Sequence, residues 1–361
     1  MKRIFILLCI TSLFLSCERD NLYEGPSLET MLGPFELIQK FQVSNQNIDF
    51  YNGESTFFTA EFSKEVDWKV VITGLSSGAI KNITGRDISL SEFNATWDGS
   101  TTNLPMFKQE ACTAELYVSY SSEIEDSTIT VSDSLIGISQ LNVTSIKENY
   151  GLILSDFELG FNDNWENRSL ASLGNVDIIN EFTDVTISTQ AGVYFNPMGG
   201  NGAPEGNMYY NLSGSCSWDW LIGMLVFPAD AFGDNTFELD DNPDKVYFNF
   251  LLNVPDNISN AKLLMRFYED DDNDGVFQSG SEDMYSLWME SFESGWQNIT
   301  VRYSDLEALV DGSPIQPDGD GVHSPNLLKT IDVLLLADPS SGFSQVQMDY
   351  IIFTEDQPLN P

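Results

Sequence analysis

Val246-Tyr247-Phe248-Asn249-Phe250-Leu251-Leu252-Asn253-Val254 is the stretch of this 361-residue chain that decides its fold class. Every second residue from Val246 to Val254 is apolar, and a period of two is typical of a β-strand that buries one face. Residues 261–269 alternate in the same way, with Leu263, Met265 and Phe267 predicted to point inward. The two segments therefore predict strands that each contribute one face to a hydrophobic core.

Strands are expected on both sides of this stretch. Residues 329–337 and 345–353 predict two closing strands, and a domain of mostly strand over residues 150–356 argues for a jelly-roll β-sandwich. Residues 36–148 hold short strands separated by turn residues, which favours an Ig-like sandwich. The predicted fold class is all-β, with an Ig-like sandwich followed by a larger jelly-roll β-sandwich.

Two local features add detail to this prediction. Trp68 and Trp97 are the core candidates of the Ig-like domain. The segment Ser304-Asp305-Leu306-Glu307 fits a capping box and predicts that a short helix begins there.

The charge of the chain excludes some partners. Lys and Arg together number 16 and Asp and Glu number 55, which gives a formal net charge of −39. A nucleic acid is not expected as a partner, because a phosphate backbone is held by Lys and Arg. Docking of the protein surface on anionic lipid is disfavoured for the same reason. Neutral polymers and divalent cations remain compatible with this charge.

The N-terminal residues predict export and a lipid anchor. Lys2 and Arg3 precede the apolar stretch 4–15, which is shorter than the roughly 20 residues that span a bilayer and has the form of a secretory signal. The stretch ends in Leu15-Ser16-Cys17, which resembles a lipobox. We therefore expect a signal peptide over residues 1–16, lipidation at Cys17 and a tether over residues 17–35. The predicted location is the outer membrane, at the cell surface, with membrane contact through the lipid anchor only.

Four short segments carry a family resemblance. In chain order they are Ser155–Glu158, Val246–Phe250, Trp296–Val301 and Met348–Ile352. This order resembles that of the galactose-binding-like carbohydrate-binding modules, including the family 11 type. Together with the lipobox and the Ig-like domain, the chain resembles a Bacteroidetes-type surface glycan-binding lipoprotein.

The resemblance implies binding of a polysaccharide or oligosaccharide without catalysis, and it allows for outer-membrane transport or enzyme partners. It also implies a calcium ion between the first and last strands of the domain, where Glu158 and Asp349 occupy the matching places. Surface charge is the alternative explanation of these two residues.

The segment Asp270-Asp271-Asp272-Asn273-Asp274-Gly275 predicts a calcium loop from its own spacing. Asp270, Asp272 and Asp274 stand at positions 1, 3 and 5 of an EF-hand-type loop, and glycine at position 6 permits the tight turn. The carbonyl of Val276 would be the ligand at position 7. Position 12 is a serine, Ser281, and either Glu282 or Asp283, which follow it at once, is expected to supply the bidentate ligand in a slightly longer loop. The expected role of Ca²⁺ is structural, and a solvated acidic turn is the alternative.

Strand faces that mix polar and aromatic residues predict the glycan site. Aromatic rings stack on sugar C–H groups, while amides and Arg donate hydrogen bonds to hydroxyls. If the strands are neighbours, their faces join into one patch; an ordinary solvent face is the alternative. The predicted residues are Tyr209, Asn211, Tyr247, Asn249, Arg266 and Tyr268, with Trp165 as a separate exposed platform. Trp218, Trp220 and Trp296 are predicted to lie in the core.

Two other functions remain open from the sequence. A structural or adhesive lipoprotein that contacts envelope proteins would use the same folds and the same calcium loop. A polysaccharide hydrolase or lyase would require a pair of carboxylates at a defined separation, and no spacing in the chain singles out such a pair.

Overall fold

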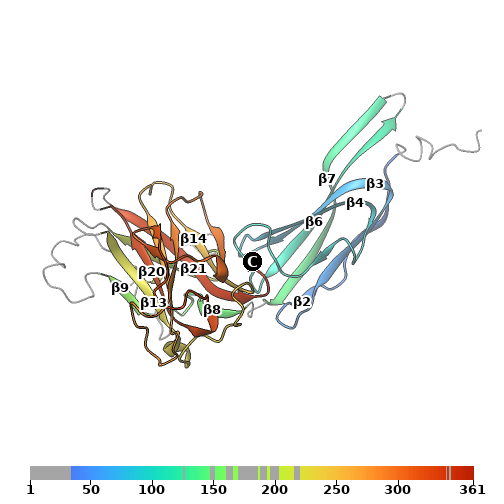
Figure 1. Ribbon diagram of the computed structural model, residues 1–361. Coiled ribbons are helices and arrows are strands. Elements are labelled where there is room, and N and C mark those ends of the chain that lie inside the picture. The colour runs from blue at the N-terminus through green and yellow to red at the C-terminus, as the bar shows by residue number, and fades with distance from the viewer. Residues whose placement is uncertain are drawn as a thin grey trace, which may run out of the picture.

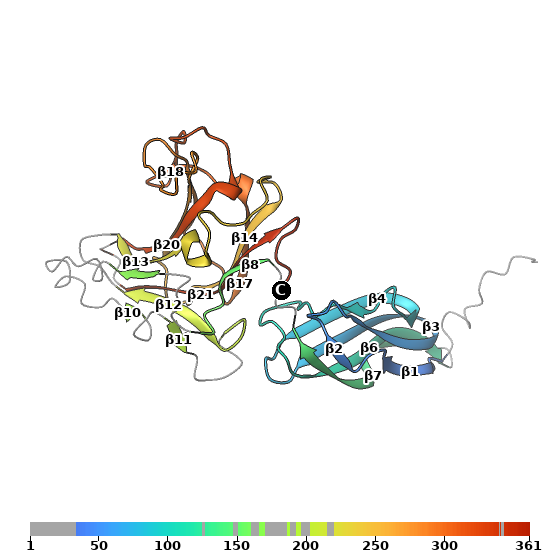
Figure 2. The ribbon, with the colours of Figure 1, turned by 90° about the horizontal axis from the view of Figure 1, so that it is seen from below.

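The computed structural model describes most of the chain from residue 34 onward. The described residues are 34–124, 127–146, 151–159, 166–169, 186–187, 193–195, 203–214, 220–338, 340 and 343–361. Cys17, Trp165, Cys216 and Trp218 lie outside them. Two strand-rich units lie side by side, and the C-terminus lies between them (Figures 1 and 2).

The first unit is built around one long strand. β3 (Thr56–Gly74) pairs in its first part with β1 (Leu37–Val43) and β5 (Thr96–Trp97) and in its second part with β6 (Ala111–Ile124). β4 (Ile80–Leu90) pairs with it from Ala60 to Thr73, with a register shift between Glu61 and Val66. β6 pairs with β7 (Ser127–Ser145), and β2 (Asn47–Asp49) adds in parallel to β7. Strict alternation of buried residues along β3 matches its sequence pattern.

Trp68 and Trp97 are both buried in the core of this unit, which confirms them as core residues. Phe50 and Phe107 pack edge-on against Trp97, at ring-centre distances of 4.9 and 4.8 Å. Cys112 is buried in the same core as a free thiol, and burial, together with the charge of Glu110, raises its pKa to about 12.

The second unit is a sandwich of two antiparallel sheets. The first sheet has the order β10-β12-β21-β14-β17, with β11 and β8 at its sides. The second has the order β16-β15-β20-β13-β9. The strands of the first sheet are β8 (Leu152–Ser155), β10 (Thr186–Ile187), β11 (Val193–Phe195), β12 (Met208–Gly214), β14 (Val246–Asn253), β17 (Gln297–Arg302) and β21 (Ser344–Glu355). Those of the second are β9 (Glu166–Ser169), β13 (Leu221–Pro228), β15 (Lys262–Glu269), β16 (Met284–Met289) and β20 (Leu328–Leu336). The all-β prediction is confirmed.

The core lies between the two sheets. The inward residues of β14 and β15 predicted from alternation are buried together, and the rings of Phe248 and Phe267 meet edge-on at 5.1 Å. The opposite face of β14 is also buried at Asn249 and Leu251. Alternation alone does not predict this second burial, because the first unit and the C-terminal tail cover that face.

The predicted helix at Ser304 is wrong. Tyr303–Asp305 forms only a single 3-10 turn, η3, and Leu306 returns to an extended backbone with φ −68° and ψ 145°. Leu306 and Ala308 are buried, and Glu307 forms a bridge with Ser286, so strand-like packing overrides the capping box. The described helices are 3-10 turns of three or four residues, and none of the described helices has the length and apolar character required to cross a membrane.

A small apolar cluster joins the two units. Met106 of the first unit is buried with Leu251, Tyr350, Ile352 and Leu359 of the second. Backbone hydrogen bonds fix the junction, since Met106 N donates to Pro204 O at 2.7 Å and Thr101 N donates to Pro361 O at 2.7 Å. The C-terminal tail therefore closes back onto the first unit.

Candidate functional site

A groove with a volume of about 1040 Å³ lies on the outer face of the sheet β16-β15-β20-β13-β9. Leu264 and Leu334, from adjacent strands, are buried residues of its lining. The polar and aromatic side chains along it include Trp220, Lys262, Arg266, Tyr268, Phe277 and Trp288. We call this surface the sheet groove.

β15 supplies the polar side of the groove because of its alternation. Leu263, Met265 and Phe267 point into the core, so the residues between them must point outward. The outward residues are Lys262, Leu264, Arg266 and Tyr268, and all four line the groove.

Two tryptophans and one lysine form the most distinctive part of the groove. Nζ of Lys262 lies 5.8 Å from the ring centre of Trp220 and 5.5 Å from that of Trp288, within the range of a cation–π contact. The same ammonium group contacts Glu290 Oε2 at 2.5 Å, which restrains it further. Two aromatic surfaces are thus placed beside a restrained cation.

The prediction that Trp220 lies in the core is wrong. Its side chain is 45% exposed and lines the groove, whereas Ile222 is fully buried. A register shift between Leu221 and Gly223 breaks the alternation at the start of β13, so Trp220 does not share the inward face of Ile222. Trp296 packs against the apolar cluster that joins the two units instead of the main core, edge-on to Tyr209 at 5.4 Å.

Tyr268 is held rigidly in the groove. Its hydroxyl donates a hydrogen bond of 2.8 Å to Asp332 on the adjacent strand β20. Burial and then the charge of Asp332 raise the pKa of Tyr268, so the phenol stays neutral. The ring of Phe277 meets it edge-on at 4.9 Å. The tyrosine thus presents a ring in a fixed position, and its hydroxyl is uncharged at neutral pH.

The single patch predicted from the strand faces is wrong. β21 separates β12 from β14 in one sheet, and β15 belongs to the other sheet. Tyr209 is only 7% exposed, Asn211 is buried, and Asn249 accepts hydrogen bonds from Thr300 Oγ1 at 2.8 Å and from Leu359 N at 3.1 Å. Tyr247 lies on β14, in the same sheet as β12, and Cζ of Arg302 is 5.7 Å from the centre of its ring. Of the predicted glycan residues that the structure describes, only Arg266 and Tyr268 reach the groove.

The acidic loop after β15 brings three of its predicted ligands together. Asp270, Asp272 and Glu282 each offer a carboxylate oxygen within 4.8 Å of the others. Asp270 is fully buried and Glu282 is 3% exposed, and Oε1 of Glu282 has no hydrogen-bond partner. Positive φ angles of 56° at Asn273 and 90° at Gly275 make the turn that gathers these oxygens. We call these three residues the loop cluster.

Asp274 lies outside this group, and Val276 follows it in the same loop. Both accept hydrogen bonds from Gln278 Nε2, at 2.7 Å to Asp274 Oδ2 and 3.2 Å to the Val276 carbonyl. Phe277 and Ser279 of the same loop line the sheet groove, so the loop that carries the carboxylates also forms part of the groove wall.

Glu158 and Asp349 are brought together with a third carboxylate, Glu205, which the sequence did not single out. Asp349 is fully buried, and its oxygens accept hydrogen bonds from Tyr350 N at 2.8 Å and Glu205 N at 3.2 Å. Glu158 Oε1 accepts from Asn207 N at 2.6 Å and Met208 N at 2.7 Å. We call these three residues the junction cluster. The turn residues on either side, Pro204 and Gly206, are the only sequence signal near Glu205.

The electrostatics of the junction cluster are unfavourable for bare carboxylates. Oε2 of Glu205 is buried without a hydrogen-bond partner. Burial and then the charge of Glu205 raise the pKa of Asp349 well above its usual value, while burial and the charges of Glu158 and Asp156 raise the pKa of Glu205. A cation beside these carboxylates would reduce the repulsion between them. Unlike the loop cluster, the three residues are not among the groups of described residues whose ligand oxygens all lie within 4.8 Å of one another.

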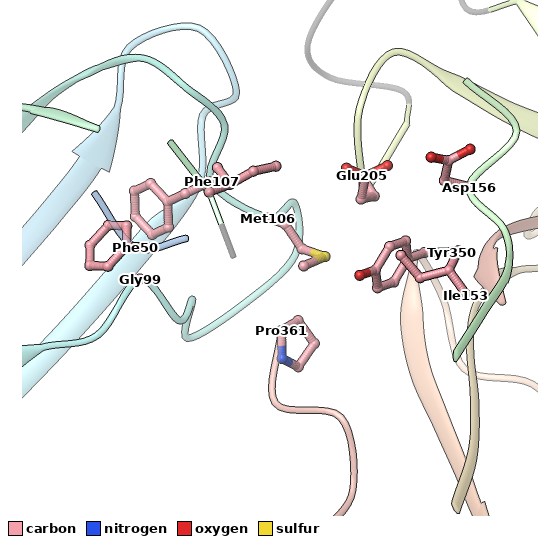
Figure 3. Close-up of a pocket in the computed structure, with 10 residues that line it drawn as sticks. Phe50, Gly99, Met106, Phe107, Ile153, Asp156, Glu205, Tyr350 and Pro361 are labelled. Atoms are coloured by element: carbon pink, nitrogen blue, oxygen red, sulfur yellow. The ribbon is translucent and has the colours of Figure 1, made fainter. Parts of the chain in front are cut away.

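A second cavity of about 320 Å³ lies between the two units, beside the junction cluster (Figure 3). Asp156 and Glu205 lie on one side of it, with Tyr350 below them and Met106 and Pro361 facing them. A backbone irregularity shapes this wall, because Tyr350 has a φ of 43° beside a register shift in the pairing of β14 with β21. Such a bulge redirects neighbouring side chains, here Asp349 into the cluster.

Comparisons with known proteins give no family assignment. No protein-family profile matches the chain, and no curated protein matches it. Among solved structures, a family 11 carbohydrate-binding module of a cellulosomal cellulase of Clostridium thermocellum has 15% identity and a TM-score of 0.35, covering 57% of this chain and 94% of that one. SGBP-B from a complex xyloglucan utilization locus in Bacteroides uniformis has 13% identity and a TM-score of 0.34, and the match covers 90% of this chain and 74% of that one. A family 30 carbohydrate-binding module of a cellulosomal cellulase of Clostridium thermocellum has 11% identity and a TM-score of 0.32, and the match covers 54% of this chain and 92% of that one. At these scores the likenesses carry no conclusion about this chain.

Proposed function

We propose that this chain binds a polysaccharide in the sheet groove without chemical turnover. The observation that carries the proposal is the arrangement of Trp220 and Trp288 around Lys262 along a groove of about 1040 Å³. Exposed aromatic rings stack on the C–H faces of sugars, and the adjacent cations donate hydrogen bonds to hydroxyls. Arg266 and Tyr268 extend the same surface along β15. The groove replaces the patch expected from the strand faces.

Calcium is proposed as a structural ion at the loop cluster and at the junction cluster. Buried carboxylate oxygens without partners, at Glu282 and Glu205, support both sites. Ca²⁺ takes six to eight oxygen ligands, so carbonyls and waters would complete each shell. At the loop cluster the ion would hold Phe277 in the groove wall.

The proposed location is the outer surface of the outer membrane. This part of the proposal rests on the lipobox at Cys17 and on the tether that follows it. The first unit then acts as an Ig-like spacer that holds the groove away from the lipid. Transport or enzyme proteins of the outer membrane are the proposed neighbours.

Native affinity gels cast with a panel of soluble polysaccharides, with calcium present, test the proposed function. Retardation of the mature protein by one glycan is expected, with no release of reducing sugar or unsaturated product on incubation with it. Trp288→Ala should abolish the retardation, whereas Tyr247→Ala, on the other sheet, is the matched control and should keep it. Retardation that survives Trp288→Ala, or no retardation by any glycan, would contradict the proposal.

A further inference from the structure

A second group of carboxylates interleaves with the loop cluster along the chain. Glu269, Asp271 and Asp283 each offer an oxygen within 4.8 Å of the others, and none of them belongs to the loop cluster. We propose that these three residues bind a divalent cation of their own, of the calcium class, beside the ion of the loop cluster. This proposal goes beyond glycan binding and does not rest on it.

Burial and an unpartnered oxygen point to a ligand at this place. Glu269 and Asp283 are both fully buried. Oε1 of Glu269 accepts hydrogen bonds from Tyr303 Oη at 2.8 Å and from Ser324 N at 2.9 Å. Oε2 of Glu269 is buried and has no hydrogen-bond partner, so it is the oxygen left for a cation. A buried carboxylate oxygen without a partner costs free energy that a bound ion would offset.

Backbone groups of the loop around Gly319 orient the other ligands. Gly319 N and Gly321 N each donate to Asp283 at 2.7 Å, one to Oδ1 and one to Oδ2. Asp283 N in turn donates to Asp271 Oδ2 at 2.9 Å. A Cβ at Gly319 would clash with Asp271 Oδ2 and would lie 2.8 Å from Asp283 Oδ1, so the loop approaches as closely as glycine permits. Such outer contacts hold metal ligands in place.

Charge balance favours a divalent ion over an isolated acidic cluster. The donors to these three carboxylates are neutral N–H and O–H groups, and no ion pair formed by the described residues involves any of the three. Three carboxylates this close repel one another unless they are protonated or bound to a cation. Because all of the ligand atoms are carboxylate oxygens, the chemistry favours Ca²⁺ over softer metals.

The ion would connect two loops that form the groove wall. Glu269 ends β15 and Asp271 lies in the loop that follows it, whereas the Gly319–Ser324 loop donates hydrogen bonds to Asp283 and Glu269. Phe277 of the first loop and Asp318 beside the second both line the sheet groove. Loss of the ion would therefore loosen this wall.

Counting bound ions by native mass spectrometry tests the proposal, using chelator-treated mature protein with calcium alone added back. Asp271→Asn is the informative variant, because an amide oxygen can still accept the bond from Asp283 N, and Asp272→Asn is the matched variant of the loop cluster. Each is expected to bind one ion fewer than the wild type, and the double variant two fewer. Equal binding by Asp271→Asn and wild type would overturn the proposal. So would a double variant that loses only one ion, since the two groups would then share it.

A second measurement covers the case in which Asp271→Asn does not fold. Gly319→Ala keeps every carboxylate but fills the space beside Asp271 and Asp283, and it should also bind one ion fewer. Terbium in place of calcium should luminesce on excitation of tyrosine, because Tyr303 and Tyr285 contact Glu269 and Asp283, at 2.8 and 3.3 Å. The emission should fall in Gly319→Ala more than in Asp272→Asn. An unchanged ion count and unchanged emission in Gly319→Ala would overturn the proposal.

Discussion

Trp220 and Trp288 share one ammonium group, since Nζ of Lys262 lies 5.8 Å from the ring centre of the first and 5.5 Å from that of the second. Trp288 comes from β16 and Lys262 from β15, while Trp220 precedes β13, so the contact runs across the sheet from one strand to another. The two rings and the lysine form a row across the sheet groove, and the buried residues Leu264 and Leu334 form part of the floor beneath it. It provides flat aromatic surfaces whose positions are restrained before any ligand arrives.

Removal of either ring should weaken glycan binding more than it weakens the fold. We expect Trp220→Ala and Trp288→Ala each to lower the affinity for the bound polysaccharide by about tenfold or more, the size of an aromatic hot spot. Isothermal titration calorimetry measures the change. The melting temperature of Trp220→Ala should stay near that of the wild type, because this ring is 45% exposed. A tenfold loss in the control Tyr247→Ala would place the site on the other sheet instead.

Calcium should stabilise the folded protein measurably. A ligand that binds only the native state at 100 times its Kd adds about 2.7 kcal/mol to the free energy of unfolding. Chelation should therefore lower the melting temperature, and calcium should restore it. Asp272→Asn should lose part of this response, whereas Asp87→Asn, an exposed acid of β4, should keep all of it. Identical melting curves with chelator and with calcium would contradict this prediction.

Glu110 should stabilise the first unit at neutral pH. Its carboxylate is buried and accepts hydrogen bonds from Ser76 N at 2.6 Å, Ser77 N at 2.9 Å and Ser77 Oγ at 2.5 Å. Burial acts to raise its pKa, but these hydrogen bonds outweigh burial and hold the pKa below its usual 4.5. A lowered carboxyl pKa means stability that is present above pH 4.5 and is lost as the pH falls through the native pKa.

Glu110→Gln should accordingly cost about 1–3 kcal/mol of unfolding free energy at pH 7, since an amide cannot accept from all of these donors. The difference between variant and wild type should shrink as the pH falls below 4.5. Urea unfolding at pH 7 and at pH 3.5 measures both effects. A difference that grows on acidification would show that the sign of the pKa shift is wrong.

The C-terminal tail should couple the two units. Leu359 is buried with Met106 in the apolar cluster that joins the two units, and Thr101 N donates to Pro361 O at 2.7 Å. Leu359→Asp places a charge in this contact, so we expect the particle in solution to lengthen as the units separate. Small-angle X-ray scattering measures the maximum dimension. Ile138→Asp, at an exposed position of β7, is the control and should leave the dimension unchanged.

Features set by neighbouring residues were predictable from the sequence. Alternation from Val246 to Val254 determined a strand and its core face, because side-chain direction along a strand is a local property. The spacing of the acidic loop predicted that Asp270, Asp272 and Glu282 meet, since one short loop holds all of them, but it also predicted Asp274, which does not join them. Burial of Trp68 and Trp97 followed from the same kind of pattern.

The tertiary structure decided everything that depends on strand order. Tyr209, Tyr247 and Tyr268 alternate correctly on their own strands, but β21 and the division into two sheets keep them apart. Trp220 reached the groove only through a register shift against β20. Glu205 N donates to Asp349, which lies 144 residues further along the chain, and Gly319 N donates to Asp283, which lies 36 residues before it. Contacts between distant segments depend on how the sheets pair and pack as a whole, so no local pattern of residues determines them.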